Sequence, residues 1–130
     1  ATSGTRYRIV YVEDNPSNIA FMQAIVEELE NVELVSASTA ELGIDLVRSH
    51  RPDVVIMDIN LPGMSGYEAT RKLRESPETK DIPIVALSAA AMVHDRKRAE
   101  EAGFYRYLTK PVKVAELVAT LEELLVVRAQ

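Results

Sequence analysis

Short runs of β-branched and other apolar residues alternate five times with patterns of helical periodicity along this chain. The runs lie at residues 8–12, 32–37, 54–57, 84–87 and 107–108. Their nearly continuous apolar character is typical of strands buried on both faces of a parallel sheet. Alternating strands and helices require right-handed crossovers that place helices over both faces. The sequence therefore predicts one α/β domain of five βα units, and 130 residues is an ordinary domain size.

Apolar residues between the predicted strands recur at helical spacing. Four of them between Met22 and Leu29 follow the i, i+3, i+4, i+7 pattern of one buried helix face. This helix is expected to begin at Pro16. Proline lacks a backbone N–H, which the first turn of a helix does not require, and Asn15 is a good N-cap. Gly103 is expected to end a later helix. The further helices are expected over residues 39–48, 66–75, 92–101 and 114–125.

The composition excludes several kinds of protein. A net charge of −5 is a poor basis for nonspecific nucleic-acid binding. The absence of cysteine excludes disulfides and thiolate metal sites. No apolar stretch approaches the roughly 18 residues of a membrane span. We therefore expect a cytoplasmic domain that contacts neither nucleic acid nor membrane.

The two ends of the chain are predicted to lie outside the folded domain. Residues 1–6 are mostly small and polar and are interpreted as a linker or an artificial remnant. The domain is expected to span residues 7–127, followed by a tail at 128–130. A start without Met favours a module cut from a longer protein.

Polar residues follow the predicted strands at the point where each strand ends. Glu13 and Asp14 follow the first run, Asp58 the third, Ser88 the fourth and Lys110 the fifth. In open α/β sheets, ligands bind outside the carboxyl ends of the strands. We therefore expect three acids, one hydroxyl and one lysine to gather at one edge of the sheet.

The predicted cluster has the composition of a phosphoryl-transfer site. Three carboxylates beside one lysine leave an excess of two negative charges, which a hard divalent cation can balance. Mg²⁺ is typically held by one or two carboxylates together with waters and phosphate oxygens. An aspartate can form an aspartyl phosphate, and a lysine and a hydroxyl can stabilise charge on the phosphoryl oxygens.

Four motifs give the chain a close resemblance to a known family. They are V-Y-V-E-D-N-P, M-D-I-N-L-P-G-M-S-G, A-L-S-A and Y-L-T-K-P, in that order. Together they resemble the receiver domains of bacterial two-component signalling over nearly the whole chain. The resemblance implies a flavodoxin-like, three-layer (βα)5 fold with strand order 2-1-3-4-5.

The resemblance also implies roles for the acidic residues. Asp58 would accept a phosphoryl group from a phosphohistidine on a histidine kinase or a histidine phosphotransfer protein. Asp14, Asp58 and the backbone carbonyl of Asn60 would bind Mg²⁺, and Glu13 would hold it through water.

The remaining roles implied by the resemblance concern the response to phosphorylation. Lys110 would pair with a phosphoryl oxygen, and the Lys110-Pro111 bond would be cis. Ser88 would bond another oxygen, and Tyr107 would then swing inward. This shift would alter a face made by the fourth helix, fifth strand and fifth helix, where a downstream protein or a second, phosphorylated copy would bind.

Several residues depart from the usual family pattern. Ser88 stands where threonine is commoner, and Phe104 and Arg106 stand where small and acidic residues are frequent. These two are expected to change the surface that faces partners. In receivers, the positions that Asn60 and Ala90 occupy tune dephosphorylation, and the small Ala90 predicts an open site with a short-lived phosphoryl group.

Alternative functions follow from the same residues. A pseudo-receiver that has kept only the fold is disfavoured by the full set of site residues. A nucleotide-binding protein or phosphatase is disfavoured because Glu13-Asp14-Asn15-Pro16 replaces a glycine-rich phosphate loop. The motif Glu-Asp-Asn-Pro-Ser-Asn resembles those of hybrid-kinase receivers. Together with the linker-like start, it favours the receiver of a hybrid sensor kinase over a stand-alone regulator.

Overall fold

Five parallel strands form one sheet in the order β2-β1-β3-β4-β5. The structure is a computed structural model that describes residues 6–89, 97 and 101–129. The strands are β1 (Tyr7–Val12), β2 (Val32–Ala37), β3 (Val54–Asp58), β4 (Ile84–Ser88) and β5 (Arg106–Thr109). The predicted α/β class and strand order are confirmed. The fifth strand is longer than predicted, because its polar ends, Arg106 and Thr109, carry no apolar signal.

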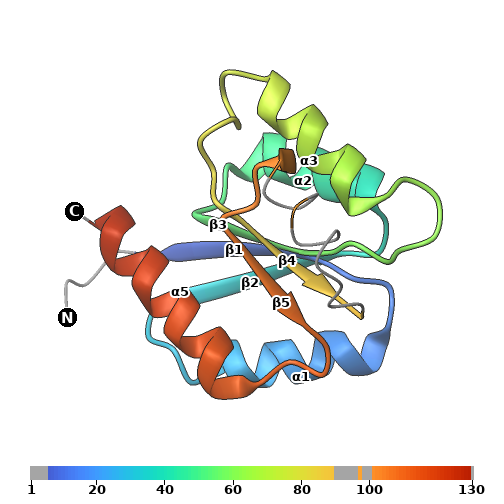
Figure 1. Ribbon diagram of the computed structural model, residues 1–130. Coiled ribbons are helices and arrows are strands. Elements are labelled where there is room, and N and C mark those ends of the chain that lie inside the picture. Colours follow the sequence, from blue (N-terminus) through green and yellow to red (C-terminus); the bar gives the residue numbers. More distant parts are fainter. Residues whose placement is uncertain (1–5, 90–96, 98–100, 130) are drawn as a thin grey trace.

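Helices cover both faces of the sheet, with α2 and α3 on one face and α1 and α5 on the other (Figure 1). The helices are α1 (Pro16–Glu27), α2 (Ala40–His50), α3 (Gly66–Glu75) and α5 (Val114–Ala129). Residues 97, 101 and 102 are also helical. Most of the helix predicted over 92–101 lies outside the described residues. Among the described helices, none combines the length and the apolar character needed to cross a membrane.

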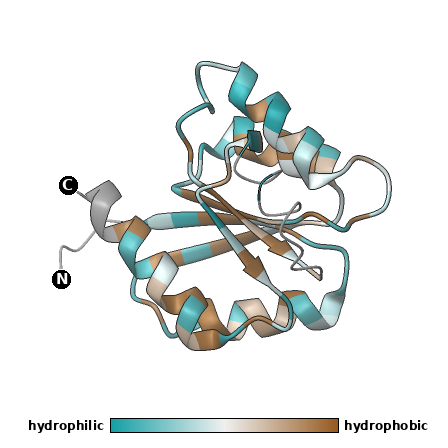
Figure 2. Cartoon of the chain, viewed as in Figure 1, coloured by the Kyte–Doolittle hydropathy of each residue, from teal (hydrophilic) through white to brown (hydrophobic). Residues whose placement is uncertain are grey.

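Alternating residues of β1 divide the hydrophobic core into two halves. Val10 and Val12 pack with α2 and α3, whereas Ile9 and Tyr11 pack with α1 and α5. Figure 2 shows hydrophobic residues concentrated along the central strands and many hydrophilic residues on the helices. Burial on both faces explains why the central strands have nearly continuous apolar sequences.

Local capping residues set several helix ends. The side chain of Asn15 accepts hydrogen bonds from the N–H groups of Ser17 and Asn18, as expected for the N-cap of α1. Thr39 caps α2, which therefore begins at Ala40 and not at 39. The predicted end at 48 is also wrong, because α2 continues to His50. It ends where Arg51 adopts a left-handed conformation (φ 46°), which the apolar pattern could not indicate.

Candidate functional site

Two acidic side chains lie next to each other at the carboxyl edge of the sheet. Val12 of β1 pairs with Met57 of β3, so the residues that follow them, Glu13 and Asp58, lie at the same level on neighbouring strands. Both side chains are buried, with Asp58 4% exposed and Glu13 1% exposed. The predicted meeting of these two acids therefore occurs, and it occurs away from bulk water.

Lys110 brings a positive charge to both carboxylates. Its Nζ lies 2.7 Å from Asp58 Oδ2 and 3.6 Å from Glu13 Oε1. Its backbone is fixed to the neighbouring strand, because the N–H of Lys110 donates to the carbonyl of Ser88 at 2.8 Å. The Lys110-Pro111 peptide is cis, as the motif resemblance implied.

Glu13 is held on both of its carboxylate oxygens. Oε2 accepts the backbone N–H groups of Asp14 at 3.1 Å and Asn15 at 3.0 Å. Oε1 accepts the hydroxyl of Tyr11 at 3.2 Å. Tyr11 was not among the predicted site residues. The available signal was its position two residues before Glu13, which places both side chains on one face of a strand.

The electrostatics of the edge show an excess of buried negative charge. Burial raises the pKa of Glu13, and the neighbouring Asp58 raises it further, against the opposing effects of the Asn15 N–H and Lys110. Burial alone would lower the pKa of Lys110. The hydrogen bond and charge of Asp58, together with Glu13, outweigh that effect and raise it. One lysine therefore serves two buried carboxylates.

Asp58 is connected to β4 through Asn60. Asp58 Oδ1 accepts the N–H of Asn60 at 2.9 Å, and the side-chain Oδ1 of Asn60 accepts the N–H of Ala89, also at 2.9 Å. Ser88, the residue before Ala89, is buried at the end of β4. The predictions for Asn60 were a carbonyl that binds the metal and a position that tunes dephosphorylation, so its side-chain bond to Ala89 is an additional finding.

The oxygen groups at this edge have the chemistry that Mg²⁺ prefers. Asp14 is exposed at the end of β1, beside the buried Glu13. Within the described part of the chain, no group of three or more aspartate, glutamate or histidine side chains is placed to hold a metal. One or two carboxylates with carbonyls and waters are the usual Mg²⁺ ligands, so Asp14, Asp58 and the Asn60 carbonyl fit this ion. The negative excess at Glu13 and Asp58 favours it further.

Tyr107, predicted to respond to phosphorylation, and Phe104 and Arg106, predicted to change the partner-facing surface, all lie in β5 or just before it. Tyr107 is half-buried and packs against the half of the core that contains α2 and α3. Phe104 packs edge-on against Tyr67, with ring centroids 5.8 Å apart. Arg106 is exposed and pairs with Glu123 of α5 at 2.8 Å. Ala90, on which the expected phosphoryl lifetime depended, lies outside the described residues.

A small apolar cleft adjoins Lys110. It has a volume of about 290 Å³ and is lined by Tyr11, Asn18, Phe21, Met22, Lys110, Pro111 and Val112. Phe21 on α1 is 47% exposed, a large fraction for an aromatic side chain on a helix that faces the core. This cleft could not be predicted from the sequence, because its two walls come from opposite ends of the chain.

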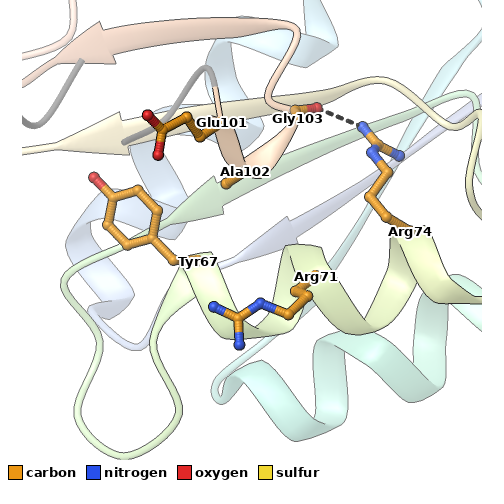
Figure 3. A pocket seen from close by; sticks show the side chains of 6 residues that line it. All are labelled: Tyr67, Arg71, Arg74, Glu101, Ala102 and Gly103. Carbon is orange, nitrogen blue, oxygen red and sulfur yellow. Dashed lines mark hydrogen bonds between the residues drawn. The ribbon is translucent and has the colours of Figure 1, made fainter. Parts of the chain in front are cut away.

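A larger cavity lies between α3 and the turn before β5 (Figure 3). Its volume is about 580 Å³, and its lining is Tyr67, Arg71, Arg74, Glu101, Ala102 and Gly103. The guanidinium of Arg74 donates to the carbonyls of Gly103, Lys80 and Ile82, each at 2.8 Å. Gly103 has a φ of +92°, the left-handed conformation predicted for a helix end. Arg74 is therefore engaged in fixing this turn to α3, and the cavity does not border the acidic edge.

Comparison with known proteins agrees with the geometry. The family model described as response regulator receiver domain matches residues 9–122. The polar-differentiation response regulator DivK of Brucella anthropi is 34% identical over 117 residues, covering 90% of this chain and 94% of that protein.

Solved structures agree as well. The receiver domain of sensor histidine kinase PA1611 from Pseudomonas aeruginosa, crystallised with magnesium in its active-site cleft, is 34% identical. Its TM-score is 0.82, with coverage of 92% of this chain and 97% of that one. The receiver domain of a signal transduction histidine kinase from Syntrophus aciditrophicus is 28% identical, with a TM-score of 0.83 and coverage of 92% and 89%.

Proposed function

Because this chain belongs to the response regulator receiver family, whose members accept phosphoryl groups in two-component signalling, we propose that Asp58 is its phosphoacceptor. The observation that carries the proposal is the setting of the Asp58 carboxylate. One oxygen accepts the Asn60 N–H at 2.9 Å, and the other lies 2.7 Å from Lys110 Nζ. The carboxylate is thereby oriented at the end of β3, with a positive charge beside it.

The proposed reaction is transfer from a phosphohistidine to Asp58. An oxygen of the Asp58 carboxylate attacks the phosphorus and forms a P–O bond. The P–N bond breaks, and its electron pair remains on the imidazole nitrogen, which takes up a proton. Lys110 neutralises charge on a phosphoryl oxygen, and the hydroxyl of Ser88 donates to another.

We propose that Mg²⁺ binds beside Asp58. Asp14, Asp58 and the carbonyl of Asn60 would hold it directly, and Glu13 would hold it through water. When bound, the ion supplies positive charge for the phosphoryl oxygens. Support comes from the oxygen-rich donor set and from the related receiver of PA1611, which was crystallised with magnesium in its cleft.

We propose that the phosphohistidine protein docks on the apolar cleft beside Lys110. The cleft joins the exposed Phe21 to the lysine that faces Asp58, so a docked histidine would lie close to the acceptor. Phe21→Ser should therefore slow transfer from a histidine kinase or phosphotransfer protein by about tenfold, the effect of losing one buried aromatic contact. It should leave phosphorylation by acetyl phosphate unchanged. Equal slowing with both donors would contradict this docking site.

Phosphorylation is proposed to act on the face formed by the helix that ends at residue 102, β5 and α5. Ser88 would move toward the phosphoryl group, and Tyr107 would move inward and change this face. A downstream protein or a second phosphorylated copy would then bind there. Two receivers of histidine kinases among the similar structures support a hybrid sensor kinase as the parent, and DivK supports the alternative of a stand-alone regulator. A cytoplasmic location remains part of the proposal.

Intact-protein mass spectrometry after incubation with acetyl phosphate and Mg²⁺ tests the acceptor. The wild-type protein should gain the mass of one phosphoryl group, and Asp58→Asn should gain none. Asp45→Asn is the matched control, because Asp45 is exposed on α2, outside the acidic edge. An unmodified wild-type protein would favour the pseudo-receiver alternative, and a phosphorylated Asp58→Asn protein would assign the acceptor elsewhere.

A further inference from the structure

The side chain of Asn60 connects the phosphoacceptor to the end of β4. Its backbone N–H donates to Asp58 Oδ1, and its side-chain Oδ1 accepts the N–H of Ala89, both at 2.9 Å. Ala89 directly follows Ser88, the hydroxyl residue that ends β4. One residue therefore contacts both the acceptor carboxylate and the strand end beside it.

The N–H of Ala89 donates to Asn60 in this structure and would gain a second possible acceptor if Asp58 carried a phosphoryl group. Its acceptor, Asn60, is itself hydrogen-bonded to Asp58. Ser88, the residue before Ala89, is proposed to bond a phosphoryl oxygen, so phosphorylation of Asp58 would bring charged oxygens toward this N–H. Hydrogen bonds to charged acceptors are roughly twice as strong as those to neutral amides. The neutral Oδ1 of Asn60 should lose this N–H to a phosphoryl oxygen.

We propose that Asn60 is a positioning residue whose side chain acts as a latch. Its Oδ1 holds the N–H of Ala89 in the unphosphorylated protein and releases it to the phosphoryl group. The inference rests on the proposed function, because it requires Asp58 to carry that group. Release lets the end of β4 approach Asp58, and Lys110 is tied to this movement through its N–H bond to the Ser88 carbonyl. The Asn60 side chain thereby sets the balance between the two arrangements.

Two substitutions should move this balance in opposite directions. Asn60→Leu keeps the branched shape of the side chain but has no acceptor, and the exposed N–H of Ala89 would pass to water. Asn60→Asp keeps the acceptor oxygen and adds charge, which strengthens the latch. Neither substitution removes the backbone carbonyl of Asn60.

The test combines hydrogen exchange measured by NMR with titration of beryllofluoride, a stable mimic of the phosphoryl group, in the presence of Mg²⁺. In the free protein, the Ala89 amide should exchange about three- to tenfold faster in Asn60→Leu than in wild type, and more slowly in Asn60→Asp. Beryllofluoride should bind about three- to tenfold more tightly to Asn60→Leu, because no internal bond has to break first. It should bind more weakly to Asn60→Asp.

The possible results separate the latch from the function on which it rests. A purely structural Asn60 would give weaker beryllofluoride binding in both variants, which would overturn the latch. Equal Ala89 exchange in wild type and Asn60→Leu would overturn it too. If the wild-type protein shows no response to beryllofluoride and acetyl phosphate, the proposed function is wrong and the latch is wrong with it.

Discussion

Replacing Lys110 with methionine should destabilise the metal-free protein, because it removes the ammonium group that lies between two buried carboxylates. Lys110 Nζ is 2.7 Å from Asp58 and 3.6 Å from Glu13, whose side chains are 5% and 1% exposed. Without the lysine, both carboxylates remain away from water and repel each other. The pKa of Glu13 is already raised in the intact protein, chiefly by burial, so its negative charge is disfavoured even before the balancing charge of Lys110 is removed.

The expected loss is intermediate between those of fully buried and fully exposed ion pairs. Removing one partner of a fully buried pair costs about 3–5 kcal/mol. The Lys110 side chain is 26% exposed, so solvent screening reduces our expectation to about 2–3 kcal/mol. For a domain of this size, that loss lowers the unfolding midpoint by roughly 8–12 °C.

The exposed pair Arg106–Glu123 provides a control at nearly the same distance. Its N–O separation is 2.8 Å, but its side chains are 43% and 49% exposed, and Glu123 keeps the Tyr105 hydroxyl as a donor. Arg106→Met should therefore cost less than about 1 kcal/mol. Urea unfolding at pH 7 without Mg²⁺ measures both variants. A Lys110→Met cost no larger than that of Arg106→Met would refute the reasoning.

A double-mutant cycle identifies the source of the Lys110 effect. Asp58→Asn removes one of the two buried charges, so it should recover part of the stability lost in Lys110→Met. Recovery of about 1 kcal/mol or more would locate the strain in carboxylate repulsion. Strictly additive losses would instead attribute the cost to the packing of the lysine stem.

Three further predictions concern the metal, the pH dependence and the loop after Asp58. Mg²⁺ should stabilise the wild-type protein in thermal unfolding, by about 2.7 kcal/mol at one hundred times its Kd, and should lose most of this effect in Asp14→Asn. Since burial raises the pKa of Glu13, its protonation favours the fold. That contribution to stability is complete below pH 4.5, the ordinary pKa of a glutamate, and is lost as the pH rises through the raised pKa of Glu13. Glu13→Gln should therefore flatten the decline in stability with rising pH, measured by unfolding at several pH values without metal. Gly66→Ala should cost about 1–3 kcal/mol and slow phosphorylation, because a Cβ there would lie 2.8 Å from the Ile59 Cα, next to Asp58. Gly63→Ala, at φ +82° with open space around it, should cost about 1–2 kcal/mol and leave phosphorylation unchanged.

The predictable part of the fold came from signals that are local along the chain. Apolar runs predicted all five strands, and Asn15 and Gly103 were correctly predicted at helix ends. The errors arose where local signals are weak. The ends of β5 are polar, and α2 ends at a backbone conformation that its side chains do not reveal.

Candidate site residues were also predictable, because each one ends a strand. Parallel strands bring their carboxyl ends to one edge whatever their order, so Glu13, Asp58, Ser88 and Lys110 had to lie on the same side of the sheet. Their proposed roles remain predictions. The expected convergence of three acids is less symmetrical in the structure, since Glu13 and Asp58 are buried together while Asp14 is exposed.

By itself, the sequence determined the class of the fold, the edge where the chemistry lies and the kinds of group gathered there. The tertiary structure alone decided which groups touch. Lys110 pairs with Asp58 across 52 residues, and Asn60 holds Ala89 across 29. These contacts depend on strand register and on the packing that fixes each side chain. Because β3 and β4 are buried along their whole length, their nearly continuous apolar pattern does not distinguish one register from the next.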